Sequence, residues 1–167
     1  MDPATILDDH ARLQEIVDLD LLSDDVDLIL NELAAEAAAH FDLPLGFVSV
    51  VLDETQHLAA QHGLDNYIGA SRGTPVEWSY CQYSVRQRDA FVVEDSSEHE
   101  LVKESPITKY DGLRCYAGIP LITTKGHAIG SFCVAGAEHR SFDDEEIEEL
   151  RGYAGRAMER IEARRSV

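Results

Sequence analysis

Hydrophobic residues recur at helical spacing at both ends of the chain and follow the period of strands in between. Residues 5–22 carry apolar side chains at near-helical spacing, which predicts an amphipathic helix with a narrow apolar face. A second helix is predicted to begin at Ser23, because three aspartates follow in its first turn, where negative charge favours the helix dipole. We expect it to end near Pro44. Its predicted inward stripe consists of Val26, Ile29, Leu30, Leu33, Ala37 and Phe41.

The period changes at Leu45, where branched and aromatic residues become frequent. Two long polar stretches interrupt the apolar segments after this point. The first is rich in Gly, Asn and Pro, the second in Ser and charged residues, and both predict loops. The expected elements are, in order, a hairpin of residues 45–53 and 57–63, a loop over 64–77, a short helix over 78–87, a strand over 91–94 and a loop over 95–110 with one helical turn.

The last two strands are predicted over residues 115–124 and 127–136, joined by the two-residue turn Lys125-Gly126. If Thr124 lies opposite His127, both faces of this hairpin are largely apolar, so helices must cover one face and loops or a ligand the other. One face is expected to hold Cys115, Ala117, Ile119, Leu121, Gly130, Phe132 and Val134, and the other Tyr116, Ile122, Ile129 and Cys133.

A long final helix is predicted to begin at the sequence Ser141-Phe142-Asp143-Asp144. Its apolar residues repeat at steps of three and four, a pattern typical of a helix-packing seam. The seam consists of Ile147, Leu150, Ala154, Ala157 and Ile161. The order of elements therefore predicts an α+β domain with one central antiparallel sheet and terminal helices packed together on one face.

Length and charge indicate how many domains the chain forms and which partners it avoids. The chain has 167 residues and 18.5 kDa, which suits a single domain. Its 32 acidic and 14 basic residues give a net charge of −18, which repels phosphate backbones and anionic lipid surfaces, so we expect no nucleic acid and no membrane as partner. Neither a signal peptide nor a membrane span is evident, and three widely spaced cysteines do not suggest a disulfide framework. We expect a cytoplasmic protein with reduced thiols.

Several short segments, in their order and spacing, resemble a GAF domain over about residues 23–160. The most specific is Gly112-Leu113-Arg114-Cys115-Tyr116-Ala117-Gly118-Ile119-Pro120-Leu121. The others are Val48–Glu54, His57-Leu58, Gly63-Leu64, Thr74-Pro75, Ser79-Tyr80-Cys81, Phe91–Asp95, Gly126–Val134 and Phe142-Asp143-Asp144. The resemblance implies a six-stranded antiparallel sheet with the first and last helices on one face and a loop-roofed pocket on the other. Residues 23–167 are then the GAF domain, and residues 1–22 an N-terminal helix that could serve dimerisation.

Aromatic and polar residues gather in the segments expected to roof the sheet. The predicted ligand-binding residues are Trp78, Tyr80, Cys81, Tyr83, Tyr110, Arg114, Cys115 and Tyr116. Mostly apolar walls with a few polar groups are typical of a site for a small molecule, although the same side chains could fill the space without any ligand. Arg114 is expected to bind the ligand if that ligand is an anion.

The resemblance does not identify the ligand, and we assign no cofactor. Relatives that bind cyclic nucleotides carry an Asn-Lys pair ahead of the last helix, where this chain has Glu138-His139-Arg140. Relatives that attach bilins place a histidine directly after the anchoring cysteine, whereas Tyr116 follows Cys115. No group of histidines and cysteines has the spacing of a metal site.

Three functions fit the sequence. The expected one is a sensory or regulatory domain in signal transduction, not an enzyme, that couples pocket occupancy to its terminal helices and acts on an output kinase or regulator. The first alternative is a redox enzyme of the free methionine sulfoxide reductase type using Cys81 and Cys115, since the predicted register puts Cys133 on the opposite face from Cys115. The second is a ligand-free dimerisation module. In the expected function the cysteines are reduced and non-catalytic.

A homodimer is expected in either non-enzymatic case. One sheet face cannot cover both the seam of the final helix and the narrow apolar stripe of the first helix, made of Ile6, Leu13 and Val17. Two copies would then join their terminal helices in a bundle.

Overall fold

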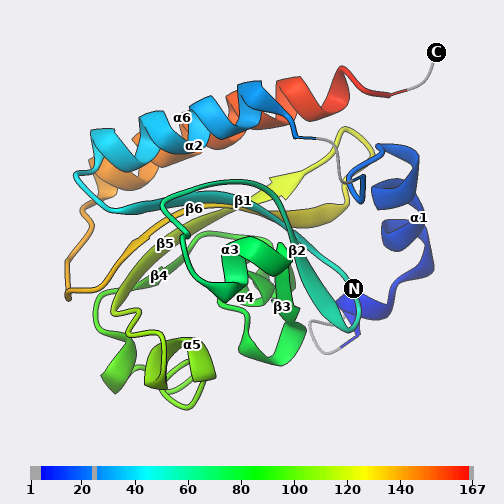
Figure 1. The fold of residues 1–167 in the computed structure, drawn as a ribbon. Helices are drawn as coiled ribbons and strands as arrows, with labels where there is room; N and C mark the ends of the chain where they lie inside the picture. Colours follow the sequence, from blue (N-terminus) through cyan, green and yellow to red (C-terminus); the bar gives the residue numbers. More distant parts are fainter. Residues whose placement is uncertain (1–4, 24–25, 166–167) are drawn as a thin grey trace.

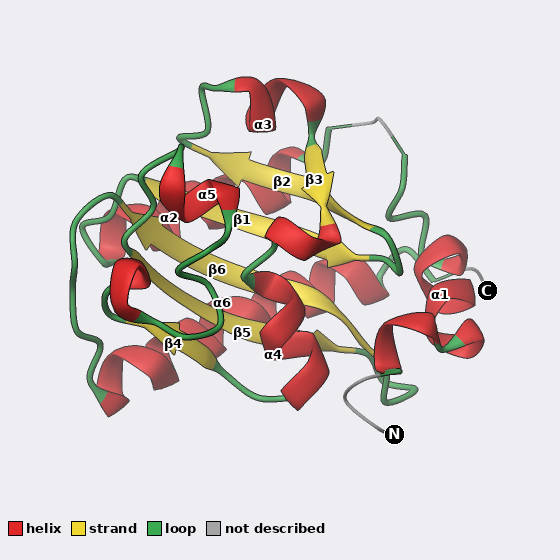
Figure 2. Ribbon diagram, turned by 90° about the horizontal axis from the view of Figure 1, so that it is seen from below, coloured by secondary structure: helices red, strands yellow, loops and turns green. Residues whose placement is uncertain are grey.

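A six-stranded antiparallel sheet separates two layers of helices in the computed structural model, which describes residues 5–23 and 26–165. The strand order is β3-β2-β1-β6-β5-β4. Helices α2 and α6 cover one face, and α3, α4 and α5 lie over the other (Figure 1; Figure 2). The strands are β1 (Leu45–Val51), β2 (Thr55–His62), β3 (Gly73–Pro75), β4 (Phe91–Val93), β5 (Cys115–Ile122) and β6 (Ala128–Gly136). The helices are α1 (His10–Asp18), α2 (Leu28–His40), α3 (Tyr67–Ser71), α4 (Cys81–Gln87), α5 (Pro106–Lys109) and α6 (Asp144–Glu162), with single 3₁₀ turns at Ile6–Asp8, Val76–Trp78 and Ser96–Glu98.

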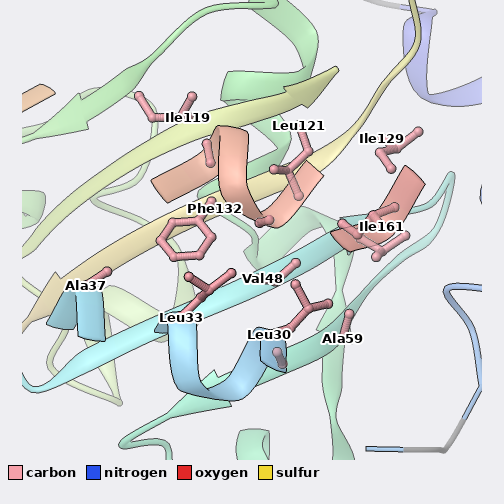
Figure 3. Packing of buried hydrophobic residues seen from close by; sticks show 14 of the residues in the cluster. Leu30, Leu33, Ala37, Val48, Ala59, Ile119, Leu121, Ile129, Phe132 and Ile161 are labelled. Carbon is pink, nitrogen blue, oxygen red and sulfur yellow. The ribbon is translucent and has the colours of Figure 1, made fainter. Parts of the chain in front are cut away.

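The larger apolar core lies between the sheet and the pair α2 and α6 (Figure 3). Gly46 allows α2 to approach closely, because a Cβ atom there would lie 2.3 Å from the carbonyl oxygen of Ala34. Four residues of the predicted α6 seam are buried in this core, namely Leu150, Ala154, Ala157 and Ile161, and Ile147 packs against it. The seam is therefore covered within the chain, and the argument that it is left over for a second copy was wrong.

Helix α2 begins later than predicted. Asp27 is its cap, because its Oδ1 accepts hydrogen bonds from the backbone N–H groups of Ile29 and Leu30 at 3.0 and 3.1 Å. The predicted start at Ser23 was wrong, and residues 24–25 lie outside the described residues. Val26, which precedes the helix, and Ile29 are 62% and 46% exposed rather than inward, because α2 turns the face of Leu30, Leu33 and Ala37 to the core. The rest of the predicted stripe is buried.

The N-terminal segment is a 3₁₀ turn followed by the short helix α1, not one helix over residues 5–22. Buried Arg12 fixes the segment to the end of the sheet: its guanidinium donates to the carbonyl oxygens of Val51 (2.7 Å) and Ala128 (3.2 Å), and also to Ile6 and Leu7. Burial lowers the pKa of Arg12 to about 10. The segment therefore packs on the same domain as the sheet.

The pairing of β5 with β6 confirms the predicted register from Cys115 to Leu121. The connection differs: the Thr123 N–H donates to the His127 carbonyl (2.9 Å), so three residues form the turn, and Gly126 takes the left-handed conformation at φ 88°. A bulge between Leu121 and Ile122 shifts the pairing by one residue, so that the strands beyond it, away from the turn, follow the predicted register. It also places Ile129 in the core under α2 and α6, so its predicted position on the Tyr116 face was wrong.

Apart from the one helical turn predicted in the second loop, the two predicted loops contain short elements that the sequence pattern did not reveal. The first holds α3, β3 and a 3₁₀ turn, and the second holds a 3₁₀ turn and α5. Strand β3 pairs with β2 and supplies the sixth strand. These pieces form the roof over the sheet face opposite α2 and α6 (Figure 2).

Candidate functional site: a cavity beneath the roof

A cavity of about 80 Å³ lies between the sheet and the roof. Its walls are mainly apolar side chains from β1, β2 and the roof segments, with a few polar groups among them. The lining residues are Leu45, Phe47, Gln56, Leu58, Leu64, Asn66, Ile68, Tyr80, Cys81, Ile107, Asp111, Leu113 and Tyr116. A mainly apolar cavity with a few convergent polar groups is the usual form of a small-molecule site.

Side-chain hydrogen bonds hold the roof in place. Buried Gln56 on β2 donates to Thr74 Oγ1 on β3 (2.9 Å) and accepts from Ser79 Oγ (2.9 Å). Ser79 Oγ in turn accepts from the backbone N–H of Gln82 (3.1 Å), at the first turn of α4. Ser105 Oγ, which caps α5, donates to the carbonyl of Trp78 at 2.8 Å. The start of α4 is thus fixed relative to β2 and to the second roof segment.

Two tyrosines form the inner wall. The rings of Tyr80 and Tyr116 lie 5.3 Å apart between centroids. Tyr80 Oη donates to Thr108 Oγ1, which itself donates to the Val102 carbonyl (2.7 Å), so the hydroxyl of Tyr80 is tied to the roof. Burial raises the pKa of Tyr80 and raises that of Tyr116 well above its usual value. Both phenols therefore remain neutral hydrogen-bonding groups.

Cys81, at the start of α4, meets Cys133 and Tyr116 under the roof. The two sulfur atoms are 3.7 Å apart, and Tyr116 Oη donates to Cys81 Sγ at 3.0 Å. Tyr116 Oη also lies 3.3 Å from Ser131 Oγ. Cys133 Sγ donates to the Phe47 carbonyl at 3.4 Å. All three cysteines of the chain are free and buried.

The structure brings three of the eight predicted site residues together in the cavity wall: Tyr80, Cys81 and Tyr116. Among the described lining residues the other five do not appear. Trp78 is half-buried in the turn before α4, and Tyr110 is 83% exposed. Tyr83 packs on Phe91 outside the cavity and donates from Oη to the Leu101 carbonyl (3.2 Å).

Arg114 lies at a separate surface depression with Asp95, Ser97 and His139. Its Nη1 donates to the backbone carbonyls of Thr108 and Leu113, each at 2.8 Å. The guanidinium therefore braces α5 and does not point its charge into the cavity.

Cys115 lies on the other side of the sheet. It shares the strand face of Ala117, and its Sγ is 3.4 Å from where a Cβ of Gly136 would be, next to Leu43 and Pro44. Burial raises the pKa of this thiol. The pairing of Cys81 with Cys115 was therefore wrong, because the alternation of strand residues turns Cys133, and not Cys115, toward α4.

The cavity residues missed by sequence reasoning are apolar positions on strands and roof segments, chiefly Phe47, Leu58, Ile68 and Leu113. Alternation along the first hairpin was the available signal, since residues on one face of β1 and β2 look toward the roof. Within the described residues, no group of three His, Cys, Asp or Glu side chains is placed to hold a metal ion. No helix in that part of the chain combines the length and hydrophobicity that crossing a bilayer requires.

The sheet, the helix pair and the cavity under the roof agree with the protein family that the sequence matches. The GAF domain model matches residues 23–162, and this covers most of the chain. The chain belongs to the GAF domain family. A curated relative, a cyclic di-GMP phosphodiesterase of Pseudomonas aeruginosa, is 30% identical over 161 residues, which are 95% of this GAF domain chain and 27% of the relative. The chain thus spans about a quarter of that relative.

Solved structures confirm the fold of the GAF domain. A GAF domain/HD domain protein of Geobacter sulfurreducens has a TM-score of 0.66 at 17% identity, over 84% of this chain and 94% of that one. The free methionine-R-sulfoxide reductase of Neisseria meningitidis, solved with its substrate, has a TM-score of 0.67 at 20% identity, over 89% and 86%. At these identities the likeness extends to the fold alone.

Proposed function

We propose that this GAF domain is a sensory or regulatory module that binds a small molecule in the cavity beneath its roof. The observation that carries the proposal is the cavity itself, which is lined mainly by apolar side chains, with polar groups from Gln56, Asn66, Asp111 and the two tyrosines among them. Three free thiols suit a reducing compartment such as the cytoplasm.

The walls favour a compact and mainly apolar ligand. The cavity volume of about 80 Å³ is well below the roughly 300–1,000 Å³ of common ligand pockets, so the cavity suits a small molecule. A larger ligand requires the short roof elements α3 and α5 to move outward. An anion is disfavoured, because the net charge is −18 and Arg114 is engaged by backbone carbonyls outside the cavity.

The sheet offers a route from the cavity to the terminal helices. Tyr116 lines the cavity from β5, and the next residue, Ala117, faces the core under α2 and α6. A ligand that displaces Tyr116 therefore shifts the strand on which α6 rests. Close packing on both faces of β5 means that such a shift cannot be absorbed locally.

Regulation of an output protein is the expected use of this coupling. The 30% identical relative is a cyclic di-GMP phosphodiesterase of which the chain covers only 27%, which supports a regulatory domain that acts beside an output enzyme. We propose an output kinase, phosphodiesterase or other regulator as the partner that responds to α6.

The test is an NMR titration of the reduced chain with a panel of two- to eight-atom organic probes, each as a neutral alcohol or ketone and as a carboxylate. Neutral probes should shift the amide signals of Phe47, Leu58 and Leu113, and carboxylates should not. Leu58→Trp, which fills the cavity, should abolish the shifts, whereas Leu101→Trp, at a 53% exposed roof position, should keep them. No saturable shift with any probe would contradict ligand sensing and favour a ligand-free module.

A further inference from the structure

Cys81 and Cys133 form a pair of neighbouring thiols, of which only Cys81 lines the cavity. The sulfur atoms are 3.7 Å apart, on α4 and β6, and both residues are almost fully buried. Cys81 lines the cavity, whereas Cys133 lies behind it against the Phe47 carbonyl. A small molecule that enters the cavity meets Cys81 first.

The surroundings distinguish the two thiols. Tyr116 Oη donates to Cys81 Sγ (3.0 Å), and Cys133 Sγ lies 3.7 Å from the same sulfur. Burial raises the pKa of Cys81, but the hydrogen bonds from Cys133 and Tyr116 outweigh it and leave this pKa below its ordinary value. Burial holds the pKa of Cys133 well above the ordinary value. Of the two thiols, Cys81 therefore loses its proton more readily than Cys133.

We propose that Cys81 and Cys133 are a reversible redox centre that reacts with small hydroperoxides entering the cavity, with Cys81 as the attacking thiol and Cys133 as the resolving thiol. Cys115 takes no part, because it lies on the opposite face of the sheet.

The reaction is balanced by the hydroperoxide alone. In the first step the Cys81 thiolate attacks one peroxide oxygen, the S–O bond forms, the O–O bond breaks, and the leaving oxygen departs as water or an alcohol after taking up a proton. Cys81 is oxidised to a sulfenic acid by two electrons, and the peroxide is reduced. In the second step Cys133 sulfur attacks Cys81 sulfur, the S–S bond forms, and the sulfenic oxygen leaves as water with the Cys133 proton. A thiol reductant reverses the change by exchange.

Oxidation would alter the roof. The sulfur atoms must approach from 3.7 Å to about 2.05 Å, so α4 is drawn against β6 and the wall formed by Cys81 and Tyr116 is rearranged. The redox centre uses the same cavity as the proposed ligand, yet it does not depend on that ligand.

The test treats the reduced full chain with hydrogen peroxide, then alkylates it under denaturing conditions and maps the peptides by mass spectrometry. The wild type should lose two of its three thiols, yield a peptide pair joined through Cys81 and Cys133, keep Cys115 alkylated, and recover all three thiols with dithiothreitol. Cys133→Ala should leave a sulfenic acid on Cys81 that dimedone traps. Cys81→Ala should slow thiol loss more than tenfold, and Cys115→Ala is the matched control that should form the same disulfide as wild type.

Equal oxidation of Cys115, a disulfide between chains, or no slowing in a folded Cys81→Ala variant would overturn the proposal. Circular dichroism checks that each variant folds. The peptide map of the wild type tests the disulfide even if a variant fails to fold. Thiol counting needs no ligand, while the NMR titration is done on reduced protein, so failure of the redox centre is distinguishable from failure of the proposed sensor.

Discussion

Gly118 leaves the space in which the hydroxyl of Tyr116 meets Cys81 and Ser131. A Cβ atom at Gly118 would lie 2.3 Å from Tyr116 Oη and 2.6 Å from Ser131 Oγ, closer than real Cβ contacts allow. Both neighbours are fully buried, so they cannot turn away into solvent. The polar cluster beneath α4 therefore depends on a residue without a side chain.

Gly118→Ala should lower the free energy of unfolding by about 1–3 kcal/mol, the range for overpacking a filled interior. The matched control is Gly155→Ala on the exposed side of α6, where a Cβ meets nothing within 4 Å. That change should raise stability by about 0.5–1 kcal/mol, because alanine is the better helix former. Urea unfolding followed by circular dichroism measures both. A neutral Gly118→Ala would show that Tyr116 has room to move.

Individual cavity residues were only partly predictable. Tyr80, Cys81 and Tyr116 do lie together in the cavity wall, in the segments expected to meet there. Arg114 and Tyr83 look like ligand-binding residues in sequence, but their side chains satisfy backbone carbonyls of the irregular roof instead. Which side chains bind backbone carbonyls of the roof depends on the direction of those carbonyls. An irregular loop has no periodic sequence pattern that predicts this direction.

Helix α1 and the segment that follows α6 are joined by an ion cluster around Glu15, whose side chain is 3% exposed. Glu15 accepts hydrogen bonds from Thr123 Oγ1 (2.5 Å), His127 Nδ1 (2.8 Å) and Arg165 Nη2 (2.8 Å). Burial raises the pKa of Glu15, but these hydrogen bonds outweigh it and hold the pKa below 4.5. Asp27 acts similarly on Arg160 and Arg164.

Glu15→Gln should cost about 1.5–3 kcal/mol of unfolding free energy at pH 7, the range for hydrogen bonds to a charged group. Because the folded pKa is the lower one, the stabilisation by Glu15 is complete above the unfolded value of 4.5 and is lost as pH falls through the folded value. The difference between wild type and variant in urea unfolding should therefore shrink as the pH falls below 4.5. Glu100→Gln, at an exposed pair with Lys103, is the control and should cost about 0–1 kcal/mol. A difference independent of pH would contradict the charge-based account.

Long periodic elements were predicted better than short ones. The β5–β6 pairing followed from two apolar segments around a glycine turn, and α6 from its seam and acidic start, where Asp143 and Glu146 form a capping box. The three-residue β3 and the four-residue α5 are too short to show a period, and tertiary contacts decide them. Strand β3 exists because it pairs with β2, a contact between segments about 18 residues apart that no local pattern encodes.

For the molecule as a whole, burial of the α6 seam moves the proposed dimer interface elsewhere. Ile161 is fully buried, so Ile161→Asp would place a charge in the core and unfold the domain, not separate two folded copies. The exposed apolar residues near the start of α2 offer the better surface: Val26, Leu28 and Ile29 are 62%, 69% and 46% exposed. They line one surface depression together with Arg160 of α6 and Arg164, two residues beyond the end of that helix.

We propose that two copies pair through Val26, Leu28 and Ile29, which joins the starts of both α2 helices next to the ends of α6. Each copy carries a net charge of −18, so repulsion opposes pairing at low ionic strength and screening relieves it. Light scattering should therefore show a mass that rises toward twice 18.5 kDa as salt increases from about 20 mM to about 500 mM. Leu28→Asp should keep the chain folded and monomeric at every salt concentration, whereas Leu101→Asp, at an exposed roof position, should dimerise like wild type. A wild-type monomer at high salt would contradict the proposed dimer.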